Sequence, residues 1–457
     1  VNETEDTRVL APAAEAFCFD YTRKMSKREV PMYHGVDGSY TTRISRAMDL
    51  FFDIPASRRK WETALDGKGE GLIQTSTDRL QGRKLFLWGT NPGGRHWQEF
   101  LSQPGKAYLE IQAGLANTQM EHLPMPANAK WEWLEAYGMM QADPKKVHST
   151  DWKEAYSAVG EKLEELLPRT VMEKELERLK TELNQNAAPI KNGSGWAALE
   201  LRRMKRLEHF TGENARFSEA ALADDQQPWL QLLEQGTFPE FPVDKFPAAY
   251  LTQEEWIPML EEAVQRKESD HWHSWLQLGV MYCAHGQWDK AKQAFENSLS
   301  RKENAWAKRN LAMIALLKGE KDAAADLLLE SVSLLPILPL AVECGKILIQ
   351  AERWEDFARF YQRLSQPIQK HGRMLAMDAQ VSVELGDFER AQSLLASGIV
   401  VDDMREGEVL LSDIWIRLHM KRLSQLEHIP EDDELRARVL REYPVPEELD
   451  FRMKTEQ

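Results

Sequence analysis

Several side chains with the potential for chemistry are concentrated in the N-terminal third of the chain. Glu110 lies in the short apolar run from Tyr108 to Gln112. In a strand, alternation places Tyr108, Glu110 and Gln112 on one face. Trp88 and Trp97 precede this run, and aromatic rings combine a large apolar surface with a defined stacking geometry. Rings that stack on a sugar, beside a carboxylate and an amide that bind its hydroxyls, predict a carbohydrate site.

Two reaction types fit these residues. Interconversion of sugar anomers requires a base and an acid, and Glu110 is the candidate base. A pairing of Glu110 with Glu121 or Glu99 instead predicts a glycosidase-type pair of carboxylates. The candidate catalytic residues are therefore Glu110 and Glu121. The candidate binding residues are Trp88, His96, Trp97, Tyr108, Gln112 and Gln119.

Each candidate also has a purely structural alternative. Glu110 is equally compatible with a strand residue held in a salt bridge, and Glu121 with a solvated loop residue. Trp88 and Trp97 are also typical of a sandwich core. The histidines do not show the spacing of metal ligands, so no metal and no other cofactor is predicted.

The Glu110 strand resembles a motif of the galactose-mutarotase-like superfamily. Aldose 1-epimerases have a late strand that reads Leu-Glu-Thr-Gln before a proline-bearing loop. This chain has Leu109-Glu110-Ile111-Gln112, with Pro124 and Pro126 after it. The resemblance implies that Glu110 takes the position of the catalytic carboxylate. The acid of those enzymes is a histidine from an earlier strand, for which this chain offers only His34 and His96, without a matching motif.

The elements around these residues alternate between short strands and turns. Residues 1–150 contain runs that favour strands, separated by turn sequences such as Asn91-Pro92-Gly93-Gly94. The predicted strands are Phe17–Tyr21, Gly71–Thr75, Lys84–Trp88 and Tyr108–Gln112, and Arg43–Ile54 is compatible with a strand or a short helix. We interpret residues 1–150 as the C-terminal part of a β-sandwich, because the chain starts inside what resembles a domain.

The second half of the chain contains a helical repeat. Four short stretches recur 33, 33 and 34 residues apart, beginning at Gly286, Gly319, Glu352 and Gly386. The same offsets bring Ala291, Ala324, Phe357 and Ala391 into register, and then Phe295, Leu328, Tyr361 and Leu395. A tight turn joining two close-packed helices requires these residue types. The pattern resembles the tetratricopeptide-repeat family, which implies stacked hairpins.

These features together predict an α+β multidomain chain. Its parts are a partial mutarotase-like β-sandwich and an α-helical tetratricopeptide-repeat solenoid. This combination resembles an uncharacterised bacterial family that joins a mutarotase-like sugar domain to such repeats. The expected boundaries are 1–150 for the sandwich, 151–195 for a helical connector and linker, 196–269 for degenerate hairpins, 270–400 for the repeats and 401–457 for a C-terminal helical cap.

The composition limits the classes of partner. A net charge of −15 disfavours nucleic acid and anionic membrane surfaces as partners. The three cysteines are too few and too scattered for a disulfide framework. With no apolar run of about 20 residues and no signal pattern, a cytoplasmic location is expected. The leading hypothesis is a carbohydrate-binding or carbohydrate-processing protein with a repeat scaffold. The alternative is a non-enzymatic scaffold whose concave repeat face binds a protein partner.

Overall fold

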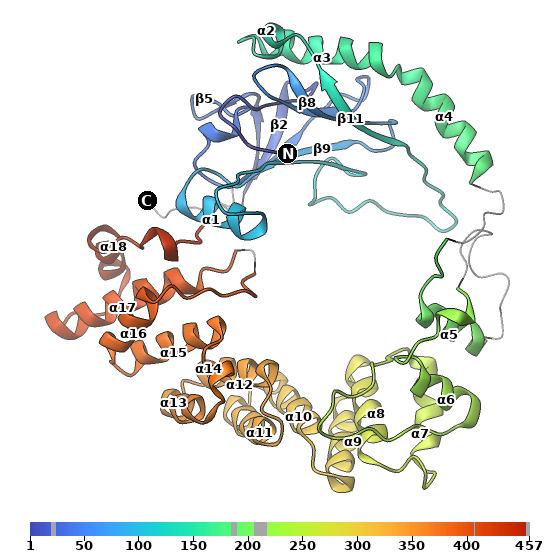
Figure 1. The fold of residues 1–457 in the computed structure, drawn as a ribbon, viewed down its shortest axis with the longest axis vertical. Coiled ribbons are helices and arrows are strands. Elements are labelled where there is room, and N and C mark those ends of the chain that lie inside the picture. The colour runs from blue at the N-terminus through green and yellow to red at the C-terminus, as the bar shows by residue number, and fades with distance from the viewer. Residues whose placement is uncertain (20–23, 184–189, 205–216, 406, 454–457) are drawn as a thin grey trace. The chain divides into compact units, whose positions relative to one another are not determined.

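The chain forms two compact units in the computed structural model, which describes residues 1–19, 24–183, 190–204, 217–405 and 407–453 (Figure 1). The first, here called the β unit, consists of Val1–Leu183, Met404–Met420 and Pro430–Gln457. The second, the helical unit, consists of Asn184–Asp403 and Lys421–Ile429. The first part of the predicted linker, residues 184–189, lies outside the described residues. None of the described helices is both long and apolar enough to cross a membrane.

The β unit is built on two antiparallel sheets. One has the order β10 (Glu110–Gly114), β9 (Gly82–Leu87), β6 (Met48–Phe52), β2 (Glu15–Phe19) and β3 (Met25–Glu29). The other has the order β1 (Arg8–Leu10), β7 (Trp61–Leu65), β8 (Glu70–Ser76) and β11 (Glu135–Gln141). The unit also contains the hairpin of β4 (Met32–Tyr33) and β5 (Val36–Asp37), the short helix η1 (Thr41–Arg43), α1 (Pro92–Leu101) and α2 (Pro144–Val147).

The two sheets pack face to face as a sandwich. Val9 and Ala64 from the four-stranded sheet share one buried cluster with Leu50, Leu85 and Leu87 from the five-stranded sheet. This shared cluster between the two sheets confirms the predicted sandwich. The four predicted strands overlap β2, β8, β9 and β10, although residues 20 and 21 of the first prediction lie outside the described residues.

Helices α3 (Trp152–Leu166) and α4 (Arg169–Glu182) follow the sandwich, as the helical periodicity after residue 151 predicts. Ala155, Val159 and Leu163 of α3 pack on Trp61 and Ile73 of the four-stranded sheet. The outer face of this sheet is therefore covered by a helix, which adds a third layer to the unit (Figure 1).

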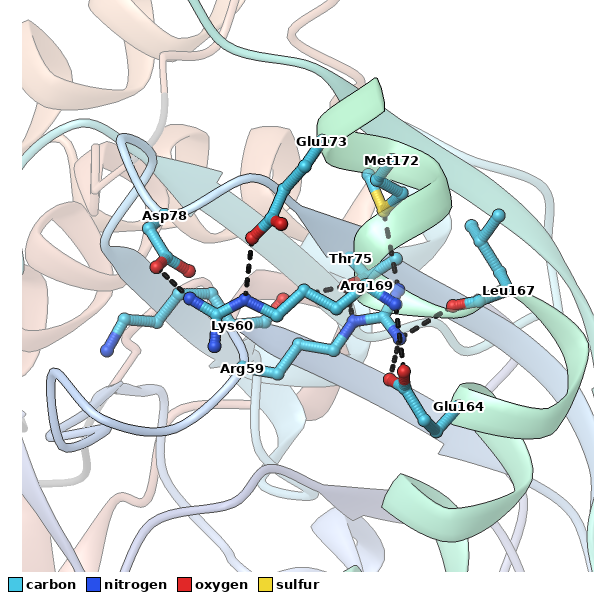
Figure 2. Close-up of polar contacts among 9 residues, drawn as sticks. All are labelled: Arg59, Lys60, Thr75, Asp78, Glu164, Leu167, Arg169, Met172 and Glu173. Carbon is cyan, nitrogen blue, oxygen red and sulfur yellow. Dashed lines mark hydrogen bonds and ion pairs between the residues drawn. The ribbon is translucent and has the colours of Figure 1, made fainter. Parts of the chain in front are cut away.

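Arg59 fastens the junction between α3 and α4 to the sheet. Its guanidinium donates to the Leu167 carbonyl at 2.7 Å and to the Glu164 carboxylate at 2.9 Å. It also reaches the Thr75 hydroxyl at 3.2 Å (Figure 2). A second arginine, Arg169, binds Asp78 and Glu173 beside it (Figure 2).

Replacing Arg59 by methionine is expected to lower the free energy of unfolding of the β unit by about 1 kcal/mol. The apolar stem is kept, but the partly buried Leu167 carbonyl loses its donor, and the cost lies at the low end of the roughly 1–3 kcal/mol of an unsatisfied buried group. Urea unfolding monitored by circular dichroism measures the change. Lys153→Met, on the exposed side of α3, is the control and should change stability little. Equal effects of the two variants would contradict this role of Arg59.

The helical unit begins with irregular helices and continues as regular hairpins. The leading part contains α5 (Gly195–Met204), η2 (Glu219–Ala221), α6 (Gln227–Gln235), η3 (Glu254–Trp256) and α7 (Ile257–Ala263). The hairpins pair α8 (Trp272–Ala284) with α9 (Trp288–Arg301), α10 (Ala305–Leu317) with α11 (Lys321–Leu334), α12 (Leu338–Gln350) with α13 (Trp354–Arg363), and α15 (Gly372–Glu384) with α16 (Phe388–Ala396). The short α14 (Gln366–Gln369) precedes the last pair.

The packing within the hairpins follows the predicted register. Ala291, Ala324, Phe357 and Ala391 are completely buried. A Cβ added to Gly279 would lie 2.4 Å from the ring of Phe295, so only glycine permits this close approach of α8 and α9. The predicted repeat spacing is therefore confirmed as a series of stacked hairpins.

The turns of the four hairpins share a left-handed backbone. Gly286, Gly319 and Gly386 have φ of +67°, +80° and +79°, and Glu352 occupies the equivalent turn with φ of +56°. Three turns thus have the residue that adopts this conformation without strain, whereas the fourth has a side chain that disfavours it.

Glu352→Gly is therefore expected to stabilise the helical unit by about 0.5 kcal/mol. The relief of left-handed strain, about 1–2 kcal/mol, is partly offset by the greater chain entropy of glycine when unfolded. Thermal unfolding measures the shift. The reciprocal Gly319→Glu, at a turn with open space around the added side chain, should destabilise. If both variants shift the melting temperature in the same direction, backbone strain is not the cause.

The chain returns to the β unit at its C-terminal end. Helix α17 (Leu410–Glu427) is followed by α18 (Asp433–Glu442) and η4 (Glu447–Leu449). The Ser412 hydroxyl donates to the Leu449 carbonyl at 2.8 Å, and residues 450–453 continue onto α1. Most of the stretch expected as a helical cap of the repeats thus belongs to the β unit.

Candidate functional site

A small cavity of about 220 Å³ opens on the outer face of the five-stranded sheet. Its lining comes from β6, β9, β10 and the loop that follows β10: Phe51, Gly82, Arg83, Lys84 and residues 112–119. Side chains alternate along β9, so Leu85 and Leu87 face the sandwich core and Lys84 faces the cavity. The cavity therefore combines polar and apolar groups, some on the sheet and some on the loop after β10.

Lys84 is the electrostatic centre of this cavity. Its ammonium group lies 2.7 Å from Asp49 and 3.0 Å from the amide oxygen of Gln119, and within 5.6 Å of the ring centres of Phe51 and Phe86. Burial raises the pKa of Asp49, which Lys84 opposes. The cavity thus has an ammonium group, an amide and aromatic rings within a few ångströms of one another.

The structure brings three of the predicted site residues to this region. The side-chain amide of Gln112 donates to the Glu110 carboxylate at 2.7 Å, and Gln112 and Gln119 both line the cavity. Glu121 is exposed in the following loop, where its carboxylate accepts from the Asn117 backbone N–H at 3.2 Å. Neither Glu110 nor Glu121 is among the residues that line the cavity.

The predicted aromatic residues lie together, but away from solvent. Trp97 on α1 is 0% exposed and Trp88 is 2% exposed. Their ring centres are 6.2 Å apart, and Tyr108 lies edge-on to Trp88 at 6.3 Å. These tryptophans form the packing core between α1 and the sheet and present no surface on which a sugar ring can stack.

This aromatic group holds the C-terminal segment of the chain. Trp97 donates its indole N–H to the Phe451 carbonyl at 2.9 Å, and His96 Nδ1 lies 2.8 Å from the Asp450 carbonyl oxygen. The His96 ring stacks on Phe451 at 4.9 Å, and the Asn91 amide reaches the Met453 carbonyl at 3.3 Å. The structure thus assigns His96 and Trp97 contacts with the protein chain itself.

Asp49 and Lys84 are not among the site residues predicted from the sequence. Both residues sit in strands whose alternation is predictable, but their pairing depends on the neighbouring positions of β6 and β9 in the sheet. Lys84 lies opposite Phe51 and Asp49 opposite Phe86, so the ion pair is a diagonal contact that gives no local signal in the sequence.

The helical unit contains a second candidate site, formed by an extended segment on the repeats. Residues 237–252 have neither helix nor strand and include three Phe-Pro pairs, at 238–239, 241–242 and 246–247. Proline keeps its preceding residue extended. The segment therefore lies against the first helices of the first two hairpins, α8 and α10, as extended stretches joined by a turn at 243–245, where the Lys245 N–H donates to the Pro242 carbonyl at 3.2 Å.

Side chains of α8 and α10 hydrogen-bond to the backbone of this segment. Trp272 donates to the Phe241 carbonyl at 3.0 Å, Gln277 to the Ala248 carbonyl at 2.9 Å, and Trp306 to the Lys245 carbonyl at 3.3 Å. Phe246 rests on Trp306, with ring centres 5.3 Å apart, and is 67% exposed. The repeats thus bind backbone carbonyls, whose positions are independent of side-chain identity.

His273 binds the same segment through both ring nitrogens. Nδ1 lies 2.9 Å from the Pro239 carbonyl oxygen and must donate, whereas Nε2 accepts from the Ala248 N–H at 3.3 Å. This arrangement requires the neutral imidazole. Burial lowers the pKa of His273 to about 4, which keeps the ring neutral at physiological pH.

Comparisons with known proteins bear on the fold. No protein-family model matches the chain, and no curated protein sequence is significantly similar to it. A solved TPR-domain containing protein from Parabacteroides distasonis aligns with 98% of this chain at 14% identity and a TM-score of 0.53. The chain spans 66% of the length of that protein.

Other solved structures align with only part of the chain. YrrB, described as a TPR protein with an unusual peptide-binding site, covers 42% of this chain, with 12% identity, 95% of its own length and a TM-score of 0.31. A tetratricopeptide repeat protein from Parabacteroides merdae covers 42%, with 16% identity, 74% of its own length and a TM-score of 0.28. Of these three, the Parabacteroides distasonis likeness is close enough to support the fold. The helical unit has the fold of a tetratricopeptide-repeat solenoid. At 14% identity the likeness concerns fold alone.

Proposed function

We propose that this protein is an interaction scaffold whose repeats bind an extended segment of a partner protein. The observation that carries the proposal is the set of hydrogen bonds that side chains of α8 and α10 donate to residues 237–252. Trp272, Gln277 and Trp306 donate to backbone carbonyls of this segment, which is extended on either side of its turn. A surface that binds one extended chain through its backbone is chemically suited to bind another.

The same face continues beyond the part that the extended segment covers. Asn310 and Met313 on α10 are half-buried, and Val342 and Lys346 follow on α12, 33 residues after Arg309 and Met313. The first helices of stacked hairpins line the concave side of such solenoids. These side chains supply one amide, one cation and apolar surface for a partner that continues the path of the internal segment.

Site-specific photo-crosslinking tests this proposal in the full-length chain. A benzophenone side chain at Met313 is expected to crosslink a defined partner protein, identified by mass spectrometry, in extracts of the native host. The same group at Glu296, exposed on α9, is the control. Asn310→Ala and Lys346→Glu should each reduce the Met313 crosslink at least about fivefold, a loss of about 1 kcal/mol. The same products from Met313 and Glu296, or no effect of the two substitutions, would argue against a concave-face partner.

We propose carbohydrate binding at the cavity of the β unit as a second function. The specific support is the convergence of Lys84, Gln112 and Gln119 on one cavity lined also by Phe51. The resemblance of residues 109–112 to the aldose 1-epimerase strand supports the same proposal. In it, Lys84 and the two amides bind sugar hydroxyls, and Glu110 orients Gln112 or acts as the base of an anomerisation.

Calorimetric titration with a panel of monosaccharides tests the second function. Wild-type binding is expected, with affinity reduced about tenfold by Gln112→Ala, the loss of one or two hydrogen bonds. Polarimetry with Glu110→Gln separates the two roles of Glu110, because anomerisation is lost only if Glu110 acts as the base, whereas a loss of Gln112 orientation weakens binding alone. Glu161→Gln, exposed on α3, is the control. A wild-type chain that binds none of the sugars rejects the proposal.

A further inference from the structure

Strand β11 is an edge strand. It is seven residues long and, among the residues that the structure describes, pairs only with β8, in register from Glu135 opposite Ser76 to Gln141 opposite Glu70. Neither proline nor lysine interrupts it. Natural proteins usually keep edge strands short, place charged residues in them or cover them, because an open edge pairs readily with another strand.

The hydrogen-bond pattern identifies which backbone groups point outward. Leu134 and Ala142, on either side of β11, both bond toward the β8 side, to Thr77 and Gly69. Antiparallel pairing alternates, so Ala136, Gly138 and Met140 also bond to β8. The N–H and C=O groups of Glu135, Tyr137, Met139 and Gln141 therefore point away from the sheet. Within the described part of the chain, no hydrogen bond reaches these groups.

Two apolar side chains at this edge, Tyr137 and Met139, are highly exposed to solvent. Tyr137 is 63% exposed and Met139 is 78% exposed, while Met140, on the opposite face, is buried in the cluster with α3. The Tyr137 hydroxyl donates to Glu135 at 2.8 Å, which holds both side chains on the same face. Two neighbouring exposed apolar side chains beside free backbone groups are typical of an interaction edge.

The strand is complementary to itself when it is reversed. With Gly138 opposite the Gly138 of a second copy, Tyr137 lies opposite Met139, Ala136 opposite Met140, and Glu135 opposite Gln141. Tyr137 and Met139 then form the hydrogen-bonded pairs and place a sulfur beside an aromatic ring, a favourable contact. No like charges meet.

We propose that β11 is the dimer interface of this protein, paired antiparallel with β11 of a second copy about a two-fold axis at Gly138. Such pairing is isologous and closes after two copies, so the two four-stranded sheets become one continuous sheet. The four outward-facing residues of each copy then have backbone partners. This proposal is independent of the proposed binding functions.

Disulfide trapping in the full-length chain tests the register. In the proposed dimer the two Gly138 residues form a non-hydrogen-bonded pair with Cα atoms about 4.5 Å apart, a spacing compatible with a disulfide. A Cβ at Gly138 meets no atom within 4 Å, so Gly138→Cys fits the folded chain. Mild oxidation is expected to convert most of this variant to a covalent dimer on non-reducing gels. Glu165→Cys, exposed on α3, and the wild-type chain, whose cysteines are buried or half-buried, should remain monomeric on the gel.

A proline at the edge provides the second test. The Met139 N–H points outward, so Met139→Pro removes a hydrogen bond of the dimer and none of those to β8. Light scattering of the wild type is expected to give twice the 52.7 kDa of one chain. Met139→Pro should raise the dimer dissociation constant at least about tenfold. Met139→Lys is the substitute if the proline variant does not fold, and Met125→Lys, in an exposed loop, is the control.

Three results would overturn the proposal. One is a wild-type chain that stays at 52.7 kDa at about 100 µM, well above the dissociation constants of stable dimers. The second is a Gly138→Cys variant that crosslinks no better than Glu165→Cys. The third is a dimer that Met139→Pro and Met139→Lys leave unchanged, which would place the interface elsewhere.

Discussion

Replacing Gly93 by valine is expected to detach residues 450–453 from α1 and to destabilise the β unit by at least about 3 kcal/mol. A Cβ at Gly93 would lie 1.9 Å from the Arg452 carbonyl oxygen and 2.7 Å from its backbone nitrogen, and backbone atoms have little freedom to move. Once the segment leaves, Trp97, His96 and Asn91 lose their partners. Each lost hydrogen bond contributes roughly 1 kcal/mol.

Urea unfolding and limited trypsin digestion measure this effect. The variant should unfold at lower urea and be cleaved faster after Arg452, since detachment exposes the segment. Gly114→Ala is the control within the same unit, because an added Cβ there meets only Ala116, at an ordinary 3.7 Å. Unchanged cleavage after Arg452 in Gly93→Val would show that the segment does not depend on this contact.

Acidification is expected to destabilise the helical unit through His273. Burial lowers the pKa of His273 to about 4, whereas an unfolded histidine titrates near 6.5. Above pH 6.5 the ring is neutral in both states, so it contributes no pH dependence. Between about 6.5 and 4 the unfolded chain binds a proton that the folded chain does not, which favours unfolding. The free energy of unfolding should fall by about 3 kcal/mol across this window.

A pH series of urea unfolding curves tests this expectation, with His273→Asn as the matched variant. Asparagine keeps a donor and an acceptor but does not titrate. The variant should be less stable at pH 7, and its stability should decline less between pH 6.5 and 4. The carboxylates titrate in the same way in the wild type and in His273→Asn. The difference between the two proteins in the slope of stability against pH therefore isolates His273. Parallel slopes would mean that His273 is not the group responsible.

The repeats were predictable because their determinants are local. Gly286, Gly319 and Gly386 lie in the turns and have left-handed φ values. Their regular spacing in the sequence was sufficient to locate these turns. The small residue Ala291 and the large residue Phe295 lie on one helix and pack within one hairpin. Contacts between residues a few tens of positions apart leave a periodic trace in the sequence.

The roles of Trp88 and Trp97 could not be predicted in the same way. Their types are compatible with both a sugar platform and a core, and the choice depends on what covers them. Trp97 is covered by Phe451, 354 residues along the chain. The strands β7 and β11 were also missed, since Glu62 interrupts the apolar pattern of one, and Gly138 and two methionines replace β-branched residues in the other.

The site in the β unit was predictable only in part. Gln112 and Gln119 were predicted because they lie near Glu110 in the sequence, and both line the cavity. Asp49 and Lys84 come together only through the pairing of β6 with β9. The three Phe-Pro pairs in 237–252 indicate a non-helical segment in the sequence. Its binding by His273 and Trp306 depends on the stacking of the hairpins, which the sequence does not show locally.

The contact between α1 and residues 450–453 has a consequence for biosynthesis. His96 and its partner Asp450 are separated by 354 residues. At roughly 5–20 residues per second, a ribosome needs about 20 to 70 s to add that length of chain. Throughout this interval α1 of the nascent chain carries Trp97 and His96 without their final partners. Helix α1 therefore keeps an apolar face open to chaperones until residues 450–453 have been translated.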